Sequence, residues 1–327
     1  MTRIDPVHFD CAEKMVRRHL KEMKADKAFV VSDLNLAALT GDFMSDFPAL
    51  HIPTGEKHKD IHTAEMIWAE LSSKGATRNS VIINIGGGMV SDTGGFAAAT
   101  FKRGIRYINL PTTLLAAVDA SIGGKTGVNF NGLKNEVGAF WQPSAVIPLT
   151  FMFSSLPEEE WLSGCGEVLK TAILAGGHRL DKVATDAFIK HRSPELVNDV
   201  VDFCLKFKEK IVAGDFRDQG RRWILNFGHT YGHALESLML EKGAPIPHGI
   251  AVAYGIEHAL QLSVERQGVG VDLLEKYREI LKNYFPALHL DQADKARISH
   301  LMDFDKKNKI FGKPEFVLLG DFNELNL

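Results

Sequence analysis

The chain has 327 residues, of which 45% are apolar and 24% charged, and its formal net charge is -3. This length and composition are typical of a globular protein with one large or two medium-sized domains. No stretch approaches the roughly 20 consecutive apolar residues of a membrane-spanning helix, and basic residues are scattered rather than gathered as in nucleic-acid-binding domains. We therefore expect no membrane or nucleic-acid partner. The composition does not exclude small anionic ligands.

The N-terminal residues and the cysteines indicate a reducing compartment. Residues 1–20 contain no apolar core of a secretory signal. The three cysteines, Cys11, Cys165 and Cys204, lie far apart in the sequence, so no disulfide framework is expected. We expect a cytoplasmic protein.

The first half of the chain alternates helical and strand-like patterns. Apolar residues at helical spacing over 11–24 predict an amphipathic helix, and residues 62–75 predict a second helix between two strands. Short runs rich in β-branched residues and bounded by turn residues predict βαβ units, and hence a parallel sheet. The expected strands cover 27–33, 80–88, 104–113 and 144–149.

After residue 156 the pattern becomes helical over 157–177, 194–215 and 228–240. A strand-like run returns only at 314–320. We therefore place a domain boundary near residue 150. An α/β domain covers 1–150, and a mainly α-helical domain covers 151–327.

Three glycines, Gly86–Gly88, follow the second expected strand and precede a helix. Such a turn lets the backbone approach a pyrophosphate, and the helix N-terminus supplies amide donors. The spacing is not G-x-G-x-x-G, so an ordinary strand-to-helix turn is an equal alternative. Asp92, just past the turn, favours a nucleotide. Further polar residues that could meet one are Asp33, Asn35, Glu56 and Lys59.

The segment 110–143 sets charged and amide side chains among glycines and other small residues. Asp119, Lys125, Lys134 and Asn135 are costly to place in such a segment unless they converge on a charged ligand. Two lysines and an asparagine suit a phosphate or a carboxylate. The alternative is a solvated glycine-rich loop.

Metal-ligating residue types recur in the second half. Glu167 and Lys170 stand at i and i+3, His229 and His233 at i and i+4, and His248 begins another helical pattern. A carboxylate and two imidazoles from three helices, with one position open, form the ligand set of a catalytic zinc site. The spacing offers three histidines for two places and leaves that choice open.

Several long motifs occur in one order: GGG-x-x-x-D, PTTLLA-x-VDASIGGKTG, LKN-x-x-GAFWQP, GE-x-x-K, NFGHT-x-GHA-E and PHG-x-A-V-x-YG. Together they resemble the 3-dehydroquinate synthase family of sugar phosphate cyclases, from about Asp33 to residues 305–309. The resemblance implies a Rossmann-like N-terminal domain, a mainly α-helical C-terminal domain, and a homodimer. It also implies NAD and a divalent metal, zinc first and cobalt second, in the cleft between the domains.

The resemblance assigns roles position by position. Glu167, His229 and His248 match the metal ligands, with His233 as a nearby proton donor. The residues that match the family's cofactor contacts are Asp33, Asn35, Glu56, Lys59, Gly87, Gly88, Met89, Val90, Ser91, Asp92, Thr112, Thr113, Lys125, Lys134 and Ser155. The residues that match the family's catalytic and substrate-binding positions are Arg103, Asp119, Lys125, Asn135, Lys170, Lys208, Arg222, Asn226, His233, Lys306 and Lys307. Of these, Arg103 matches an arginine that reaches a neighbouring subunit.

The reaction implied is conversion of 3-deoxy-D-arabino-heptulosonate 7-phosphate, a sugar acid phosphate, to 3-dehydroquinate and phosphate in the shikimate pathway of aromatic amino acid and chorismate biosynthesis. NAD would oxidise a substrate hydroxyl transiently, phosphate would be eliminated, and re-reduction and aldol closure would follow, so the enzyme is a lyase. Arg222 suits the substrate carboxylate. The alternatives are another sugar phosphate cyclase, a metal-dependent polyol dehydrogenase, and a non-catalytic binding relative.

Overall fold

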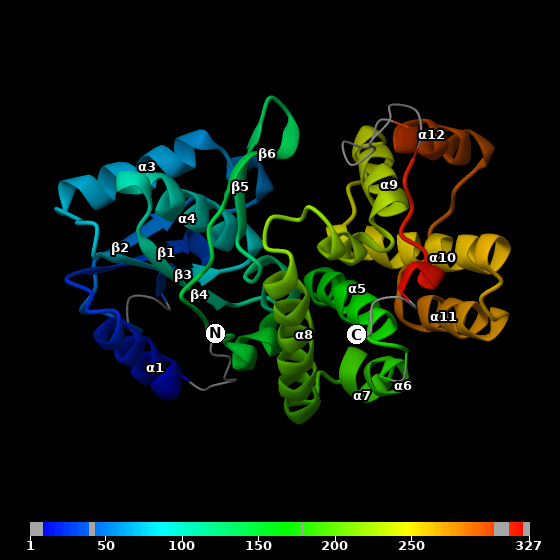
Figure 1. Ribbon diagram of the computed structural model, residues 1–327, viewed down its shortest axis with the longest axis horizontal. Coiled ribbons are helices and arrows are strands. Elements are labelled where there is room, and N and C mark those ends of the chain that lie inside the picture. Colours follow the sequence, from blue (N-terminus) through cyan, green and yellow to red (C-terminus); the bar gives the residue numbers. More distant parts are fainter. Residues whose placement is uncertain (1–8, 39–42, 178, 304–313, 323–327) are drawn as a thin grey trace. The chain divides into compact units, whose positions relative to one another are not determined.

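The computed structural model in Figure 1 describes residues 9–38, 43–177, 179–303 and 314–322. The chain forms two compact units, one made of Met1–Leu156 and Val197–Arg217 and the other of Pro157–Leu196 and Asp218–Leu327. This division differs from the expected boundary at residue 150, because most of α8 (Pro194–Gly214) groups with the first unit. There, Thr150 Oγ1 donates to Asn198 Oδ1 at 2.7 Å.

The first unit contains the expected parallel sheet, in the order β2-β1-β3-β4-β7. Both sides of each interior strand are buried, as the run of apolar residues predicts. Strand β2 was not predicted, because its four residues alternate too briefly to stand out. The strands are β1 (Ala28–Asp33), β2 (Ala49–Ile52), β3 (Val81–Gly86), β4 (Arg106–Pro111) and β7 (Ala145–Val146).

Helices cover both faces of this sheet. Val30 packs in a cluster with residues of α1 (Phe9–Glu22), whereas Val31, one residue on, packs with residues of α3 (Ile61–Ser73) and α4 (Gly88–Thr100). In Figure 1, α1 lies on one side of the sheet, and α3 and α4 lie on the other. The alternation follows from the period-2 geometry of a strand, and it confirms the α/β, Rossmann-like architecture of this unit.

The glycine-rich segment after β4 forms a hairpin instead of a loop. Strand β5 (Lys125–Phe130) pairs antiparallel with β6 (Leu133–Phe140), and Gly127 stands opposite Gly138. A Cβ on Gly138 would lie 2.3 Å from the carbonyl oxygen of Thr126, so the two backbones need a glycine here. No strand was predicted over this segment, because glycines lower strand propensity.

The second unit is mainly helical, as expected. Its α10 packs against α5, α9 and α11. No helix in the described ranges is long and apolar enough to cross a membrane. The helices are α5 (Glu158–Leu174), α6 (Leu180–Val183), α7 (Asp186–Ile189), α9 (His229–Glu241), α10 (His248–Gln267), α11 (Val271–Tyr284) and α12 (Gln292–Asp303).

The strand expected at 314–320 is wrong. Its backbone amides bond to side chains of α10 and not to a neighbouring strand: Leu319 N donates to Ser263 Oγ at 3.0 Å, and Gly320 N donates to Gln267 Oε1 at 2.6 Å. A short 3-10 helix, Leu319–Phe322, ends the described part of the chain. The apolar run therefore packs on α10 without pairing.

Candidate active site

The glycine turn lies at the carboxyl end of β3, where parallel sheets bind ligands. Because β1 has β2 on one side and β3 on the other, the carboxyl ends of β1 and β3 form a topological switch point. Asp33 ends β1 and Gly86 ends β3. Helix α4 begins at Gly88 with Gly87 as its N-cap, so its first amides have no acceptor within the helix.

Some residues around this turn can contact a ligand through their side chains, and others only through their backbones. Val90 is 1% exposed and packs in the core with residues of α3 and α4, so only its backbone can meet a ligand, whereas Met89 is partly buried against the same cluster. Ser91 is also buried. A Cβ on Gly87 would lie 3.3 Å from Cγ2 of Thr113, and Thr112 N donates to Gly86 O at 3.0 Å. Both threonines therefore line the turn.

Lys59 and Asp92 form an ion pair beside the turn, in which Lys59 is buried and the Asp92 side chain is 17% exposed. Lys59 Nζ lies 2.6 Å from Asp92 Oδ2 and 4.0 Å from Glu56 Oε1. Burial works to lower the pKa of Lys59, but the carboxylates of Asp92 and Glu56 outweigh it and raise that pKa above its usual value. The loop that carries Lys59 and the second turn of α4 are thus joined through opposite charges.

Asn129 on β5, which the sequence did not single out, extends this cluster. Its Nδ2 donates to Glu56 Oε1 at 3.0 Å, and its backbone N donates to Lys59 O at 2.7 Å. Its Oδ1 accepts from the backbone N of Asn135 at 2.9 Å. The hairpin is therefore tied to the Lys59 loop. Only the structure reveals this role, because Glu56 and Asn129 are 73 residues apart in the sequence.

Replacing Lys59 with methionine is expected to destabilise the protein by about 3 kcal/mol, because the mostly buried Asp92 carboxylate loses its partner. Urea unfolding measures this loss. The Lys57→Met variant, on the same loop but exposed, is the control and should unfold like the parent. Adding Asp92→Asn to Lys59→Met should restore part of the loss, and full additivity of the two changes would contradict the pairing.

The other residues that we expected to contact a cofactor are more exposed than Lys59. Burial raises the pKa of Asp33, whose Oδ1 accepts from the backbone N of Asn35 at 2.9 Å. Asn35 itself is exposed. Ser155, also exposed, donates through Oγ to Met152 O at 2.8 Å. No bond between Ser155 and the glycine turn is found in the described ranges.

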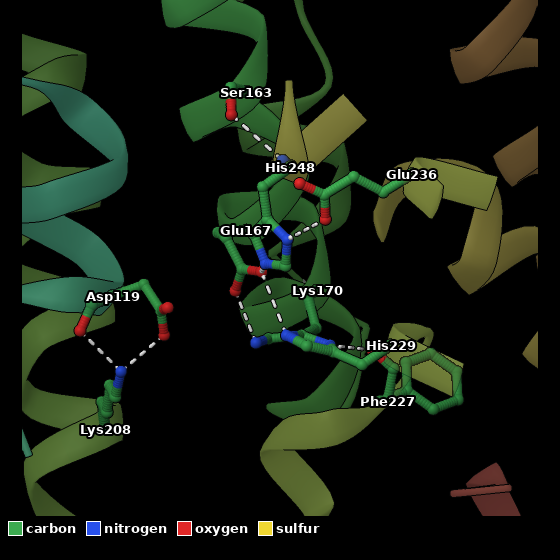
Figure 2. Close-up of polar contacts among 10 residues, drawn as sticks. Asp119, Ser163, Glu167, Lys170, Lys208, Phe227, His229, Glu236 and His248 are labelled. Atoms are coloured by element: carbon green, nitrogen blue, oxygen red, sulfur yellow. Dashed lines mark hydrogen bonds and ion pairs between the residues drawn. The ribbon is translucent and has the colours of Figure 1, made fainter. Parts of the chain in front are cut away.

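Asp119 and Lys208 meet across the first unit, 89 residues apart in sequence. Lys208 Nζ donates to Asp119 Oδ1 at 2.5 Å and to Asp119 O at 2.6 Å (Figure 2). Asp119 lies in a π-helical turn, Ala116–Ala120, a rare form that occurs often at functional sites. Lys125 opens β5, Lys134 lies on β6, and both are exposed.

Backbone strain marks the segment that carries Arg103. Lys102 and Arg103 have φ of 50° and 68°, and Gly104 follows at 111°. Two successive non-glycine residues in this region are uncommon and cost energy, so such strain often accompanies function. Arg103 is exposed. Lys306 and Lys307 lie outside the described residues.

In the second unit, three helices bring together a carboxylate and three imidazoles. Glu167 on α5 is 1% exposed, and its Oε1 lies 3.6 Å from His229 Nε2 and 3.9 Å from His248 Nε2 (Figure 2). His229 and His233 belong to α9, and His248 begins α10. One ligand atom from each histidine lies within 4.8 Å of the other two. The expected ligands therefore converge, with His233 beside them.

The neighbours of the two rings define which nitrogen carries the proton. Phe227 O lies 3.3 Å from His229 Nδ1, and Glu236 Oε2 lies 3.2 Å from His248 Nδ1. A carbonyl and a carboxylate can only accept, so each Nδ1 donates, and in the neutral imidazole each Nε2 then presents a lone pair. These are the tautomers that metal-binding histidines adopt.

Two lone pairs and a carboxylate oxygen facing one another repel unless a cation lies among them. Oε1 of Glu167 is buried and accepts no hydrogen bond from the described residues. Ligand atoms of a tetrahedral zinc stand about 3.4 Å apart, given bonds near 2.1 Å, and the 3.6 Å and 3.9 Å separations are close to this value. The residues present fit a divalent metal.

Glycines bring α5 and α10 close enough to make this site. A Cβ on Gly166 would lie 2.0 Å from Gly249 O, and one on Gly249 would lie 1.8 Å from Ser163 O. The backbone N of Gly249 donates to Ser163 Oγ at 3.0 Å. Next to this contact, Lys170 Nζ lies 2.5 Å from Glu167 Oε2. The motif GE-x-x-K thus combines a close approach with a buried ion pair.

Arg222 and Asn226 lie on the 3-10 helix Arg221–Asn226, which leads into α9. The Arg222 residue is 3% exposed, an unusual burial for a guanidinium. Gly228 then adopts a left-handed conformation with φ of 80°, where a Cβ would lie 2.7 Å from Ile256 N. This turn sets His229 at the start of α9.

Two residues of this centre had no role in the sequence prediction. Glu236 completes the motif GHA-E, seven residues after His229, and this spacing on a helix was a usable signal. Ser163 had no such signal, because its partner Gly249 is 86 residues away.

One unit has a parallel sheet with a glycine turn at its switch point, and the other is a helical unit whose residues fit a metal. Together they define the class: a two-unit α/β enzyme with a candidate metal centre. The chain belongs to the 3-dehydroquinate synthase family. The model for the N-terminal part of 3-dehydroquinate synthase matches residues 49–163, and the model for its C-terminal part matches residues 164–308.

Known relatives agree with this assignment. The 3-dehydroquinate synthase of Parabacteroides distasonis is 41% identical over 314 residues, which cover 94% of this chain and 88% of the relative. Among solved structures, 2-deoxy-scyllo-inosose synthase complexed with carbaglucose-6-phosphate, NAD+ and Co2+ matches with a TM-score of 0.80 at 24% identity, covering 94% of this chain and 84% of its own.

A second solved structure, ValA (2-epi-5-epi-valiolone synthase) from Streptomyces hygroscopicus subsp. jinggangensis with NAD+ and Zn2+ bound, matches with a TM-score of 0.79 at 21% identity. The match covers 92% of this chain and 86% of that one. At these identities both structures support the fold alone.

Proposed function

We propose that this enzyme is a carbon-oxygen lyase that converts 3-deoxy-D-arabino-heptulosonate 7-phosphate to 3-dehydroquinate and phosphate, with NAD used catalytically. The observation that carries the proposal is the buried Glu167 Oε1 facing the Nε2 lone pairs of His229 and His248. In a member of the 3-dehydroquinate synthase family, a metal at this point suits a substrate hydroxyl that has to be oxidised.

When bound, NAD accepts and returns a hydride, and the divalent metal, zinc in our proposal with cobalt as a substitute, polarises the substrate hydroxyl. The chain supplies the positions for both. The glycine turn, the Lys59–Asp92 pair and Asp33 are assigned to NAD; Glu167, His229 and His248 are assigned to the metal. Thr112, Thr113, Asn35, Glu56, Lys125, Lys134 and Ser155 complete the proposed cofactor contacts.

The basic and amide side chains are assigned to the substrate anions. Arg222, held in place by burial, binds the carboxylate through its planar fork. Lys125 and Asn135 bind the phosphate, and His233 exchanges a proton there. Lys170, paired with Glu167, fixes the orientation of the metal-binding carboxylate. The remaining proposed substrate contacts are Asp119, Lys208, Asn226, Lys306 and Lys307.

We further propose a homodimer in which Arg103 contributes to the phosphate site of the partner subunit. The exposure of Arg103 and its left-handed backbone support this role, because a guanidinium presented on a strained turn is arranged for a contact outside its own unit. Sedimentation at assay concentrations distinguishes a dimer from a monomer, and a monomer that is fully active would contradict the proposal.

The decisive test is the stoichiometry of the reaction. With 3-deoxy-D-arabino-heptulosonate 7-phosphate as substrate, one phosphate should be released per substrate consumed, with no net NADH. A chelator should abolish turnover, and added zinc or cobalt should restore it. Free phosphate and absorbance at the NADH wavelength are read in the same sample.

Two alternatives predict different results in this assay. Another sugar phosphate cyclase would turn over sedoheptulose 7-phosphate, which lacks the carboxylate, at least as fast as the heptulosonate. A metal-dependent polyol dehydrogenase would accumulate NADH with glycerol and release no phosphate from the heptulosonate. Either result would overturn the proposed substrate, whereas the buried Arg222 favours the carboxylate-bearing one.

A further inference from the structure

Glu236 lies next to the metal centre on the same helix as two of its histidines. It follows His229 by seven residues, about two helical turns, so α9 presents His229, His233 and Glu236 on one face. Its side chain is 16% exposed, and Oε2 lies 3.2 Å from Nδ1 of His248, on α10 (Figure 2). One carboxylate thus links α9 to the first residue of α10.

We infer that Glu236 is a positioning residue that fixes the tautomer and the ring orientation of His248 for metal binding. The inference rests on the proposed function, because it takes His248 as a ligand. The carboxylate accepts the Nδ1 proton, which leaves the Nε2 lone pair directed toward Glu167 Oε1 at 3.9 Å. A carboxylate in this position also increases the electron density of the ligating nitrogen.

The two histidines depend on different kinds of support. His229 is held by a backbone carbonyl, Phe227 O, and its side chain is only 10% exposed. His248 stands at the half-buried start of α10, and its side chain is 30% exposed. A more exposed ring has more freedom to rotate, so its orientation needs a hydrogen bond more than that of a packed ring. The side chain of Glu236 supplies it.

The test measures zinc affinity by competition with a chromophoric chelator. Glu236→Met keeps a similar volume but has no acceptor, and Glu236→Gln keeps an acceptor oxygen without the charge. We expect Glu236→Met to weaken zinc binding about 10–100-fold, the range for lost outer-shell partners. Glu236→Gln should recover part of that loss.

Glu241→Ala is the matched control, because Glu241 ends the same helix and pairs with Arg297 at 2.7 Å, away from the histidines. Its zinc affinity should equal that of the parent. A second readout is the visible spectrum of the Co2+-loaded protein, which reports the geometry of the ligands. Glu236→Met should change that spectrum, whereas Glu241→Ala should not. NAD affinity, measured for each variant, checks that the fold is intact.

The outcomes separate this inference from the proposed function. If Glu236→Met binds zinc as tightly as the parent with an unchanged cobalt spectrum, the positioning role is overturned while the metal-dependent reaction stands. Equal losses in Glu236→Met and Glu236→Gln would also overturn the hydrogen-bond role. If the parent binds no zinc or cobalt, both the inference and the proposed function fail.

Discussion

Replacing Glu167 with glutamine is expected to lower phosphate release by more than 100-fold and to remove the zinc-dependent gain in stability. The substitution keeps the shape of the side chain and removes its charge. Because losing an outer-shell partner already costs about 10–100-fold in metal affinity, losing a direct ligand should cost more. Lys170 would also lose its buried partner, which lies 2.5 Å away.

The measurement is thermal unfolding with and without zinc, together with turnover. Zinc at 100 times its dissociation constant should stabilise the parent by about 2.7 kcal/mol, and the Glu167→Gln variant should show no such gain. Glu160→Gln, exposed in the first turn of the same helix, is the control and should behave like the parent. A variant that keeps both the zinc response and turnover would remove Glu167 from the ligand set.

Replacing Gly166 with alanine is expected to destabilise the protein by about 3 kcal/mol or more, at the upper end for overpacked cores. The new Cβ would stand 2.0 Å from Gly249 O, and a backbone oxygen cannot rotate away as a side chain can. Helices α5 and α10 would have to move apart. Glu167 and His248 would then separate, so zinc affinity should fall together with the free energy of unfolding.

Gly270→Ala is the matched control for this substitution. A Cβ on Gly270 meets nothing within 4 Å, and its φ of -60° suits alanine. Urea unfolding and zinc competition on both variants give the comparison. Parent-like stability and zinc affinity in Gly166→Ala would show that the close helix contact is not required for the metal site.

Much of the candidate metal centre could be predicted, because helical spacing is a local property. The i, i+4 pair His229 and His233 and the i, i+3 pair Glu167 and Lys170 follow directly from residue numbers. The parallel sheet also followed from its apolar runs. The family resemblance, not the spacing, selected His229 and His248 from the three histidines.

What the sequence could not provide depends on contacts between distant segments. Lys59 and Asp92 are 33 residues apart, and Lys208 and Asp119 are 89 apart, so no periodicity connects them. The β5–β6 hairpin was missed because Gly127 and Gly138, weak strand formers, are needed where two backbones meet. These ion pairs and this hairpin depend on packing between segments that are distant in sequence, which local sequence patterns do not encode.

The return of α8 to the first unit has a consequence for engineering. The chain passes between the two units three times, after residues 156, 196 and 217. A gene cut once near residue 150 would therefore yield a first fragment without Lys208 and a second fragment with a surplus helix. A single crossover therefore cannot exchange one whole unit between relatives. Recombined libraries of this family need at least three matched junctions.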